Sequence, residues 1–110
     1  MIEIKPIALE QLNTFRMSVL ERAEVLGSVD VYLQEERAYL VNLNSGVLDT
    51  ALLFGLGKAA LNLADLRGAK EAVCSDPSME SFMAPLRFKK TSESLWTLSL
   101  EHYFETGCHA

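Results

Sequence analysis

The hydrophobic positions of this chain change their spacing several times, and each change predicts a new element. In segment 2–7 isoleucines alternate roughly with charged residues, which predicts a strand at or near a sheet edge, ended by Pro6. From Leu9 to Leu26 the apolar residues recur every three or four positions. That spacing predicts an amphipathic helix, closed by Gly27 as its cap residue.

The next part of the sequence predicts a β-hairpin. Val31 to Leu33 and Ala38 to Leu43 are rich in Val, Tyr and Leu, and four polar residues separate them. Asn44-Ser45-Gly46 is a turn cluster that ends the second strand. A long apolar stretch from Asp49 to Gly68 follows it.

The last third predicts a strand, a short helix and a final strand. Glu71 to Ser75 is a short apolar strand that should lie parallel to the hairpin strand before it, since a helix connects the two. Asp76 and Pro77 fit the N-cap and first position of a helix, which Pro85 limits to about two turns. Ser94 to Tyr103 alternates apolar residues and reads as a buried strand.

The predicted order is strand, helix, strand, strand, helix, strand, helix, strand. This order indicates a mixed β-sheet with helices on its faces, in the α/β or α+β class. A chain of 110 residues is enough for one hydrophobic core, so a single domain over residues 1–110 is expected. Within it, residues 106–110 are expected to be a flexible tail.

Composition and charge narrow the function classes. The net charge of −5 comes from 15 acids and 10 scattered bases, so nucleic acid is not an expected partner. The start lacks a signal-peptide pattern and no apolar run reaches the roughly 20 residues that span a bilayer, so a cytoplasmic protein is expected. Cys74 and Cys108 are expected to be free thiols, and no metal is expected, because Cys108 beside His109 lies too near the chain end.

The stretch from Asp49 to Gly68 has two interpretations because it contains Gly55-Leu56-Gly57-Lys58. If a helix starts at Asp49, the glycine amides bond to carbonyls four residues back and cannot hold a phosphate. If the chain as far as Phe54 is irregular, those amides point outward and a helix N-terminus offers a phosphate site. The apolar residues before the glycines favour the continuous helix.

The same stretch is apolar around nearly its whole circumference. Only Lys58 and Asn62 are strongly polar between Thr50 and Ala64. A helix on one face of a sheet needs only one apolar stripe, so its outer side should be covered by a second copy, the C-terminal segment or a ligand. A homodimer through Asp49 to Leu66 is the first expectation.

Three motifs together resemble one known family. The IEIKPI strand, the Gly-x-Gly-Lys after a hairpin strand and the late Leu-x-Phe-Lys-Lys before the last strand resemble the GNAT family of acetyl-CoA-dependent N-acetyltransferases. The resemblance is most visible from Tyr39 to Phe104. It implies a GNAT-like domain that binds acetyl-CoA or another acyl-CoA and transfers the acyl group to an amine that the sequence does not identify.

The resemblance also implies where the cofactor would lie. In GNAT proteins a Gln/Arg-x-x-Gly-x-Gly/Ala motif offers backbone amides and a helix N-terminus to the cofactor's pyrophosphate. Here that role would fall on Gly55, Gly57 and Lys58. Backbone amides around Asn44 and Ser45 would polarise the thioester carbonyl.

The catalytic residues are not identified by the resemblance, and two kinds of candidate remain, glutamates and tyrosines. Glu35 and Glu36 lie at the hairpin tip, near where GNAT enzymes sometimes keep a general base, although turn glutamates are usually only solvated. Tyr103 could supply the proton that the leaving thiolate needs, as could Tyr32 or Tyr39, although strand tyrosines more often serve packing.

Four positions depart from the GNAT pattern. Leu52 replaces the leading polar residue of the phosphate motif, and Asp76 replaces an Asn. Met83 stands where the family often has a proton-donating Tyr, and Arg87 stands where it has a Gly. This pattern implies a retained fold with changed or lost chemistry, so a non-catalytic structural or protein-interaction module is the competing hypothesis.

Overall fold

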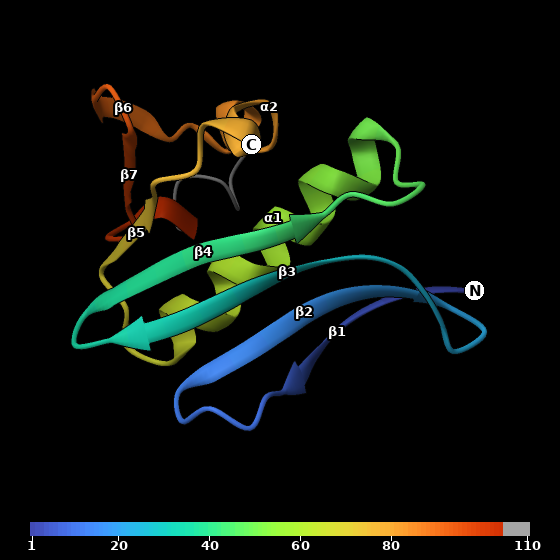
Figure 1. The fold of residues 1–110 in the computed structure, drawn as a ribbon. Helices are drawn as coiled ribbons and strands as arrows, with labels where there is room; N and C mark the ends of the chain where they lie inside the picture. The colour runs from blue at the N-terminus through green and yellow to red at the C-terminus, as the bar shows by residue number, and fades with distance from the viewer. Residues whose placement is uncertain (105–110) are drawn as a thin grey trace.

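A seven-stranded mixed sheet with helices against it forms the protein (Figure 1). The structure, a computed structural model, describes residues 1–104. In chain order the elements are β1 (Ile2–Ala8), β2 (Thr14–Glu21), β3 (Glu24–Gln34), β4 (Arg37–Asn44), α1 (Thr50–Leu66), β5 (Glu71–Cys74), the 3-10 turn η1 (Pro77–Met79), α2 (Glu80–Met83), the 3-10 turn η2 (Ala84–Leu86), β6 (Lys89–Ser92) and β7 (Leu95–Ser99). The strand order in the sheet is β1-β2-β3-β4-β5-β7-β6. The predicted mixed sheet of the α+β class is confirmed.

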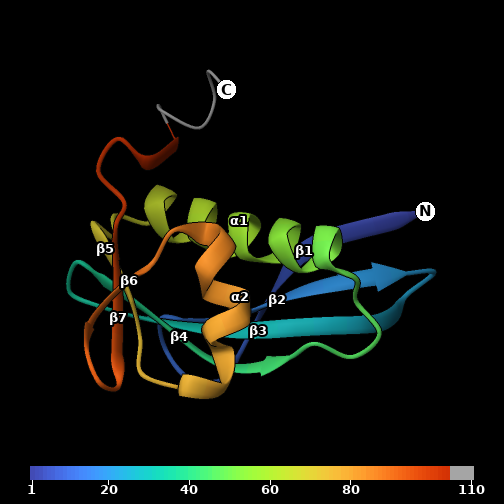
Figure 2. The same cartoon turned by 90° about the horizontal axis from the view of Figure 1, so that it is seen from above.

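The hydrophobic core lies between α1 and the sheet. Figure 2 shows α1 lying along one face of β1 to β4, and no described element covers the opposite face of these strands. Side chains from β2, β3, β4 and α1 meet in this core, including Phe15, Val19, Val29, Val31, Leu40, Leu56, Ala60 and Leu61.

The predicted helix from Leu9 to Leu26 is wrong, because this segment forms β2 and the beginning of β3. The apolar residues that face the core alternate with a period of two, as Phe15, Met17 and Val19 do, while Leu12 is 86% exposed. Arg22 and Ala23 both have positive φ and form the tight turn between the strands. Such turns usually carry Asn or Gly, and neither residue is present at positions 22 and 23, so no turn signal marks this turn.

Two smaller predictions in the same region are also wrong. Gly27 is not a helix cap but a buried residue of β3, where a Cβ atom would lie 2.5 Å from the Leu48 side chain. Pro6 does not end the first strand but lies inside β1, opposite Met17 of β2. The prediction that this strand forms a sheet edge is confirmed.

The later elements agree better with the sequence. The antiparallel hairpin is confirmed as β3 and β4, and the parallel pairing of the strands on either side of α1 is confirmed for β4 and β5. Asp76 caps the turn that Pro77 begins, accepting the Ser78 amide at 2.9 Å. The final strand is confirmed as β7 but is shorter than predicted, and β6 was missed because all four of its residues are exposed. The tail at 106–110 lies outside the described residues.

The two glycines in α1 bring neighbouring elements close to the helix. A Cβ atom at Gly57 would lie 2.5 Å from Cδ1 of Leu86 in η2, and one at Gly55 would lie 3.3 Å from Cδ1 of Ile4 in β1. Leu86 is fully buried, so its side chain has little room to move. Packing alone therefore explains why position 57 carries a glycine.

We expect Gly57→Ala to destabilise the fold by about 1–3 kcal/mol, because the added methyl overlaps Leu86. Gly55→Ala is the matched control and should be neutral or stabilising, because Ala is about 1 kcal/mol more favourable than Gly inside a helix. Urea unfolding measures both. Adding Leu86→Ala to the Gly57→Ala variant should lower the free energy of unfolding by less than Leu86→Ala lowers it in the wild type. Equal stability of Gly57→Ala and Gly55→Ala would contradict the packing role of Gly57.

Candidate functional site

The start of α1 decides between the two interpretations of the glycine motif. The helix begins at Thr50, and Asp49 is its N-cap residue. The Asp49 side chain accepts a hydrogen bond of 2.8 Å from the Leu52 amide. Gly55 and Gly57 therefore lie inside the helix, where their amides belong to its internal hydrogen bonds. The continuous-helix interpretation is confirmed, and the glycines do not form a phosphate loop.

Lys58, the third predicted phosphate ligand, faces aromatic rings. Its Nζ lies 4.6 Å from the ring centroid of Tyr103, 5.3 Å from that of Phe104 and 5.6 Å from that of Phe54. These cation–π contacts hold Tyr103 and Phe104, the end of the described chain, against α1. The C-terminal segment therefore covers part of the outer side of α1, while Phe54 and Leu66 stay 39% and 73% exposed. The homodimer through this helix stays a prediction.

Beyond their first residues β4 and β5 separate and leave a fork. Arg37 to Tyr39 pair with Glu71 to Val73, and no later residue of β4 pairs with β5. Figures 1 and 2 place α2 beside the part of β4 that has lost this partner. Asn44 and Ser45, the predicted carbonyl-binding residues, lie at the open end of β4, next to the start of α1.

The strand β4 carries a bulge close to this end. Asp30 pairs with Val41 and Ser28 pairs with Asn44, so two residues of β4 lie opposite one residue of β3. Asn42, the first of the two, has φ of 53°. A bulge changes the direction of the strand and of its backbone groups, and bulges are common beside binding sites.

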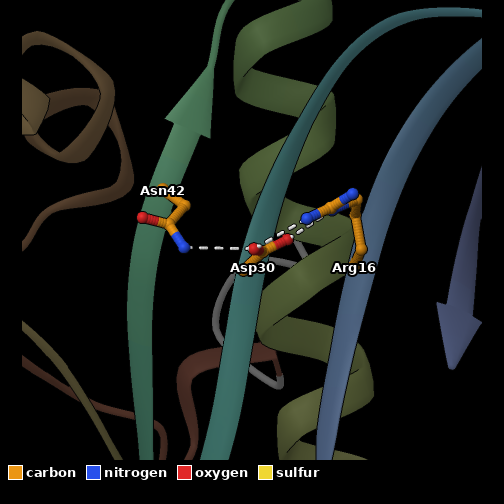
Figure 3. Close-up of polar contacts among 3 residues, drawn as sticks. All are labelled: Arg16, Asp30 and Asn42. Carbon is orange, nitrogen blue, oxygen red and sulfur yellow. Dashed lines mark hydrogen bonds and ion pairs between the residues drawn. The ribbon is translucent and has the colours of Figure 1, made fainter. Parts of the chain in front are cut away.

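A polar network holds the bulge from the uncovered face of the sheet (Figure 3). The carboxylate belongs to Asp30, which is only 5% exposed. It accepts hydrogen bonds from Arg16 Nε at 2.7 Å, from a terminal nitrogen of Arg16 at 3.1 Å and from Asn42 Nδ2 at 3.3 Å. The Asp30 hydrogen bond and charge raise the pKa of Arg16 above its ordinary value. The network ties β2, β3 and β4 together. Sequence reasoning missed it because Arg16 had been placed on a helix rather than opposite Asp30.

The candidate general bases lie at the opposite end of β4 from Asn44 and Ser45. Glu35 and Glu36 form the β3–β4 turn, and the Glu36 carbonyl accepts the amides of Lys70 at 2.7 Å and Glu71 at 3.2 Å. This tip lies at the start of β4, and the eight-residue strand spans about 23 Å before Asn44. The structure does not bring these glutamates together with the predicted cofactor residues.

Tyr103 lies beside Lys58 of α1. Its hydroxyl donates to the Leu86 carbonyl at 3.1 Å, and burial raises its pKa, so the phenol keeps its proton at neutral pH. Tyr39 stacks on Tyr32 with ring centroids 4.6 Å apart. Each tyrosine therefore has a packing role.

Cys74 has no activating neighbour among the described residues. It is buried, with its Sγ 3.7 Å from the Met79 sulfur, and burial raises the pKa of its thiol. A thiol in this state is a poor nucleophile.

Residues 1–104 contain no group of three or more His, Cys, Asp or Glu side chains placed to hold a metal ion. Cys108 and His109 lie outside this range. None of the described helices is both long and apolar enough to cross a membrane. The cytoplasmic location stays a prediction.

The start of α1 does not fit the pyrophosphate of an acyl-CoA. A helix N-terminus binds phosphate through free amides and the positive end of its dipole. Here the Asp49 carboxylate accepts one of those amides and places a negative charge on the dipole's positive end. A phosphate at the same position would lose a donor and meet a like charge.

No protein-family model matches this sequence, and no curated protein matches it either. Solved structures do match the fold. A GNAT family acetyltransferase from Elizabethkingia anophelis with acetyl-CoA bound superposes with a TM-score of 0.71 at 12% identity, over 89% of this chain and 97% of that one. An aminoglycoside 6'-N-acetyltransferase from Enterococcus faecium gives 0.69 at 9% identity, over 83% and 77%. An IAA acetyltransferase from Bacillus cereus gives 0.67 at 12% identity, over 84% and 79%.

These similarities show that the chain has the GNAT fold. The fold of an acetyltransferase is thus established for this chain. At such low sequence identity the likeness does not extend to the activity.

We expect Arg16→Met to destabilise the fold by about 2 kcal/mol, because Asp30 would then keep only the Asn42 amide as a partner for its buried charge. Combining it with Asp30→Asn should cost less than the sum of the two single changes, since the unpaired charge is then removed. Urea unfolding of the three variants measures this coupling. Strict additivity would mean that the two side chains are energetically independent.

Proposed function

We propose that this chain is a non-catalytic GNAT-fold module that no longer binds acyl-CoA and acts through its surfaces as a structural or protein-interaction domain. The observation that carries the proposal is the Asp49 carboxylate at the N-terminus of α1. It occupies the position where the cofactor's pyrophosphate would need unpaired amides and positive potential.

The other departures from the GNAT pattern support the same proposal. Met83, at the position of the proton-donating tyrosine, is fully buried in the core. Asp76 accepts both the amide and the hydroxyl of Ser78, so its carboxylate serves a local cap. Arg87 adopts φ of 74° where the family has Gly, which keeps the turn without the glycine. The fold is thus kept at all three positions, while the family's proton donor is missing at Met83.

One observation favours a second candidate function, acyl-CoA binding and acyl transfer to an amine. The fork between β4 and β5 and the bulge at Asn42 leave backbone groups without a strand partner near Asn44 and Ser45. The Elizabethkingia neighbour, of which 97% is covered, was solved with acetyl-CoA bound. In this candidate the bulged strand would bind the thioester carbonyl, and the fork would hold the pantetheine arm.

A thermal shift with acetyl-CoA separates the two functions. The first proposal expects no change in Tm at millimolar acetyl-CoA. A ligand at 100 times its Kd stabilises the fold by ~2.7 kcal/mol, which for a chain of this size raises Tm by several degrees. A shift of that size would overturn the first proposal and support the second.

Asp49→Asn tests whether the Asp49 carboxylate prevents the binding of acetyl-CoA. Asn caps helices about as well as Asp, so the variant should keep its stability while losing the negative charge. We expect acetyl-CoA to raise the Tm of Asp49→Asn more than that of the wild type. Free phosphate at the same ionic strength is the control for a general anion effect, and equal responses of both proteins to acetyl-CoA would show that Asp49 does not govern binding.

A further inference from the structure

The edge strand β1 is an unpartnered side of the sheet. It has seven residues and pairs with β2 alone among the described strands. Ile2 and Ile7 are 40% and 42% exposed. The opposite edge is the shorter β6, which begins with Lys89 and Lys90. Both edges carry charged residues, but β1 is three residues longer than β6 and therefore offers the longer row of unpaired backbone groups.

The hydrogen bonds show which groups of β1 face outward. The Leu9 amide donates to the Thr14 carbonyl at 3.3 Å, in register with the β1–β2 ladder. In an antiparallel ladder every second residue bonds to its neighbour, so the odd-numbered residues of β1 bond to β2 and the even-numbered ones face outward. Pro6 is among the outward residues, where its missing N–H costs no bond to β2. Ile2 and Ile4 offer both an amide and a carbonyl to a partner.

We propose that a second copy of this chain pairs with β1 in antiparallel fashion, about a two-fold axis that passes beside Ile4. Each Ile4 would exchange both backbone hydrogen bonds with the partner's Ile4. Each Ile2 amide would donate to the partner's Pro6 carbonyl. The contact is isologous, as in most homodimers.

The charges of β1 select this register. Glu3 would lie opposite the partner's Lys5 and Lys5 opposite the partner's Glu3, at the pair positions where side chains of antiparallel strands come closest. Within one chain these two side chains already form an ion pair of 3.3 Å. Shifting the axis toward Glu3 would put Glu3 opposite Glu3, and shifting it toward Lys5 would put Lys5 opposite Lys5. Both alternatives keep outward groups paired but place like charges together.

The apolar residues of β1 would line the other face of the same seam. Ile4 lies on the face that carries α1, since it approaches Gly55, and Ile2 and Pro6 share that face by alternation. In the proposed register Ile2 meets the partner's Pro6, and Ile4 meets the partner's Ile4. Exposed apolar side chains of β1 would thus be covered on one face while the charges pair on the other.

Charge reversal tests the register directly. Sedimentation equilibrium at micromolar protein should show a dimer for the wild type. Glu3→Lys and Lys5→Glu each replace both cross-strand ion pairs with like charges and should weaken the dimer about tenfold or more. The double variant restores opposite charges and should recover the wild-type dissociation constant. A wild-type monomer at every concentration, or a double variant no better than the singles, would overturn the proposal.

Hydrogen exchange locates the contact. The Ile4 amide should become protected as protein concentration rises, while the Lys5 amide, which already bonds to β2, should be protected at all concentrations. Phe54→Ser on α1 is the matched control and should leave the dimer unchanged. A dimer that survives the charge variants, leaves the Ile4 amide unprotected and is lost in Phe54→Ser would place the second copy on α1 instead.

Discussion

The rest of the structure depends on where α1 begins. The Asp49 side chain accepts the Leu52 amide and sets the first turn at Thr50. Because the helix starts there, Gly55 and Gly57 lie inside it, beyond its first turn, and face β1 and η2. A helix that began after the glycines would free their amides for a phosphate, but it would withdraw the apolar residues before them from the positions where they pack. The same carboxylate therefore sets the packing of α1 and is the group on which the proposed loss of cofactor binding rests.

A second constraint acts from the uncovered face of the sheet. Asp30 is buried there without a described helix above it; Arg16 supplies the opposite charge, and Asn42 donates a further hydrogen bond. Burying a carboxylate is costly unless it is paired, so this triad locks β2, β3 and β4 in one register. The register places the bulge at Asn42 and thereby the direction in which β4 leaves the sheet. The fork is thus maintained by side chains on the face opposite to the core.

How far the sequence predicted the fold depends on how local each signal is. Asp49, Asp76 and the hairpin carry their signals within a few residues, and the structure agrees with them. The segment 9–26 failed because its apolar residues fit both a helical and a strand spacing, and because the turn at Arg22 and Ala23 lacks the usual glycine. Only pairing with the rest of the sheet, which is not local, decides between the two.

The candidate site was predicted less well than the fold for the same physical reason. The glycine motif is visible in the sequence, but the role of Gly57 depends on the helix start and on Leu86, which is distant in sequence. The pairing of Arg16 with Asp30 requires the register of two strands, and this could not be seen while one of them was assigned to a helix. A family resemblance identifies the positions of a motif in the sequence. Tertiary contacts decide what role the residues at those positions have.

If the cofactor site is lost, the exposed apolar side chains of this fold cannot be explained by a bound cofactor. In an acyltransferase, exposed apolar residues near the start of α1 could be accounted for by ligand. If Asp49 excludes the ligand, the exposed side chains of Ile2 on β1 and Phe54 on α1 need another cover. The two elements are neighbours, because a Cβ atom at Gly55 of α1 would lie 3.3 Å from Cδ1 of Ile4 on β1. The two proposals therefore rest on neighbouring elements, the absence of a cofactor on Asp49 at the start of α1 and the association on β1.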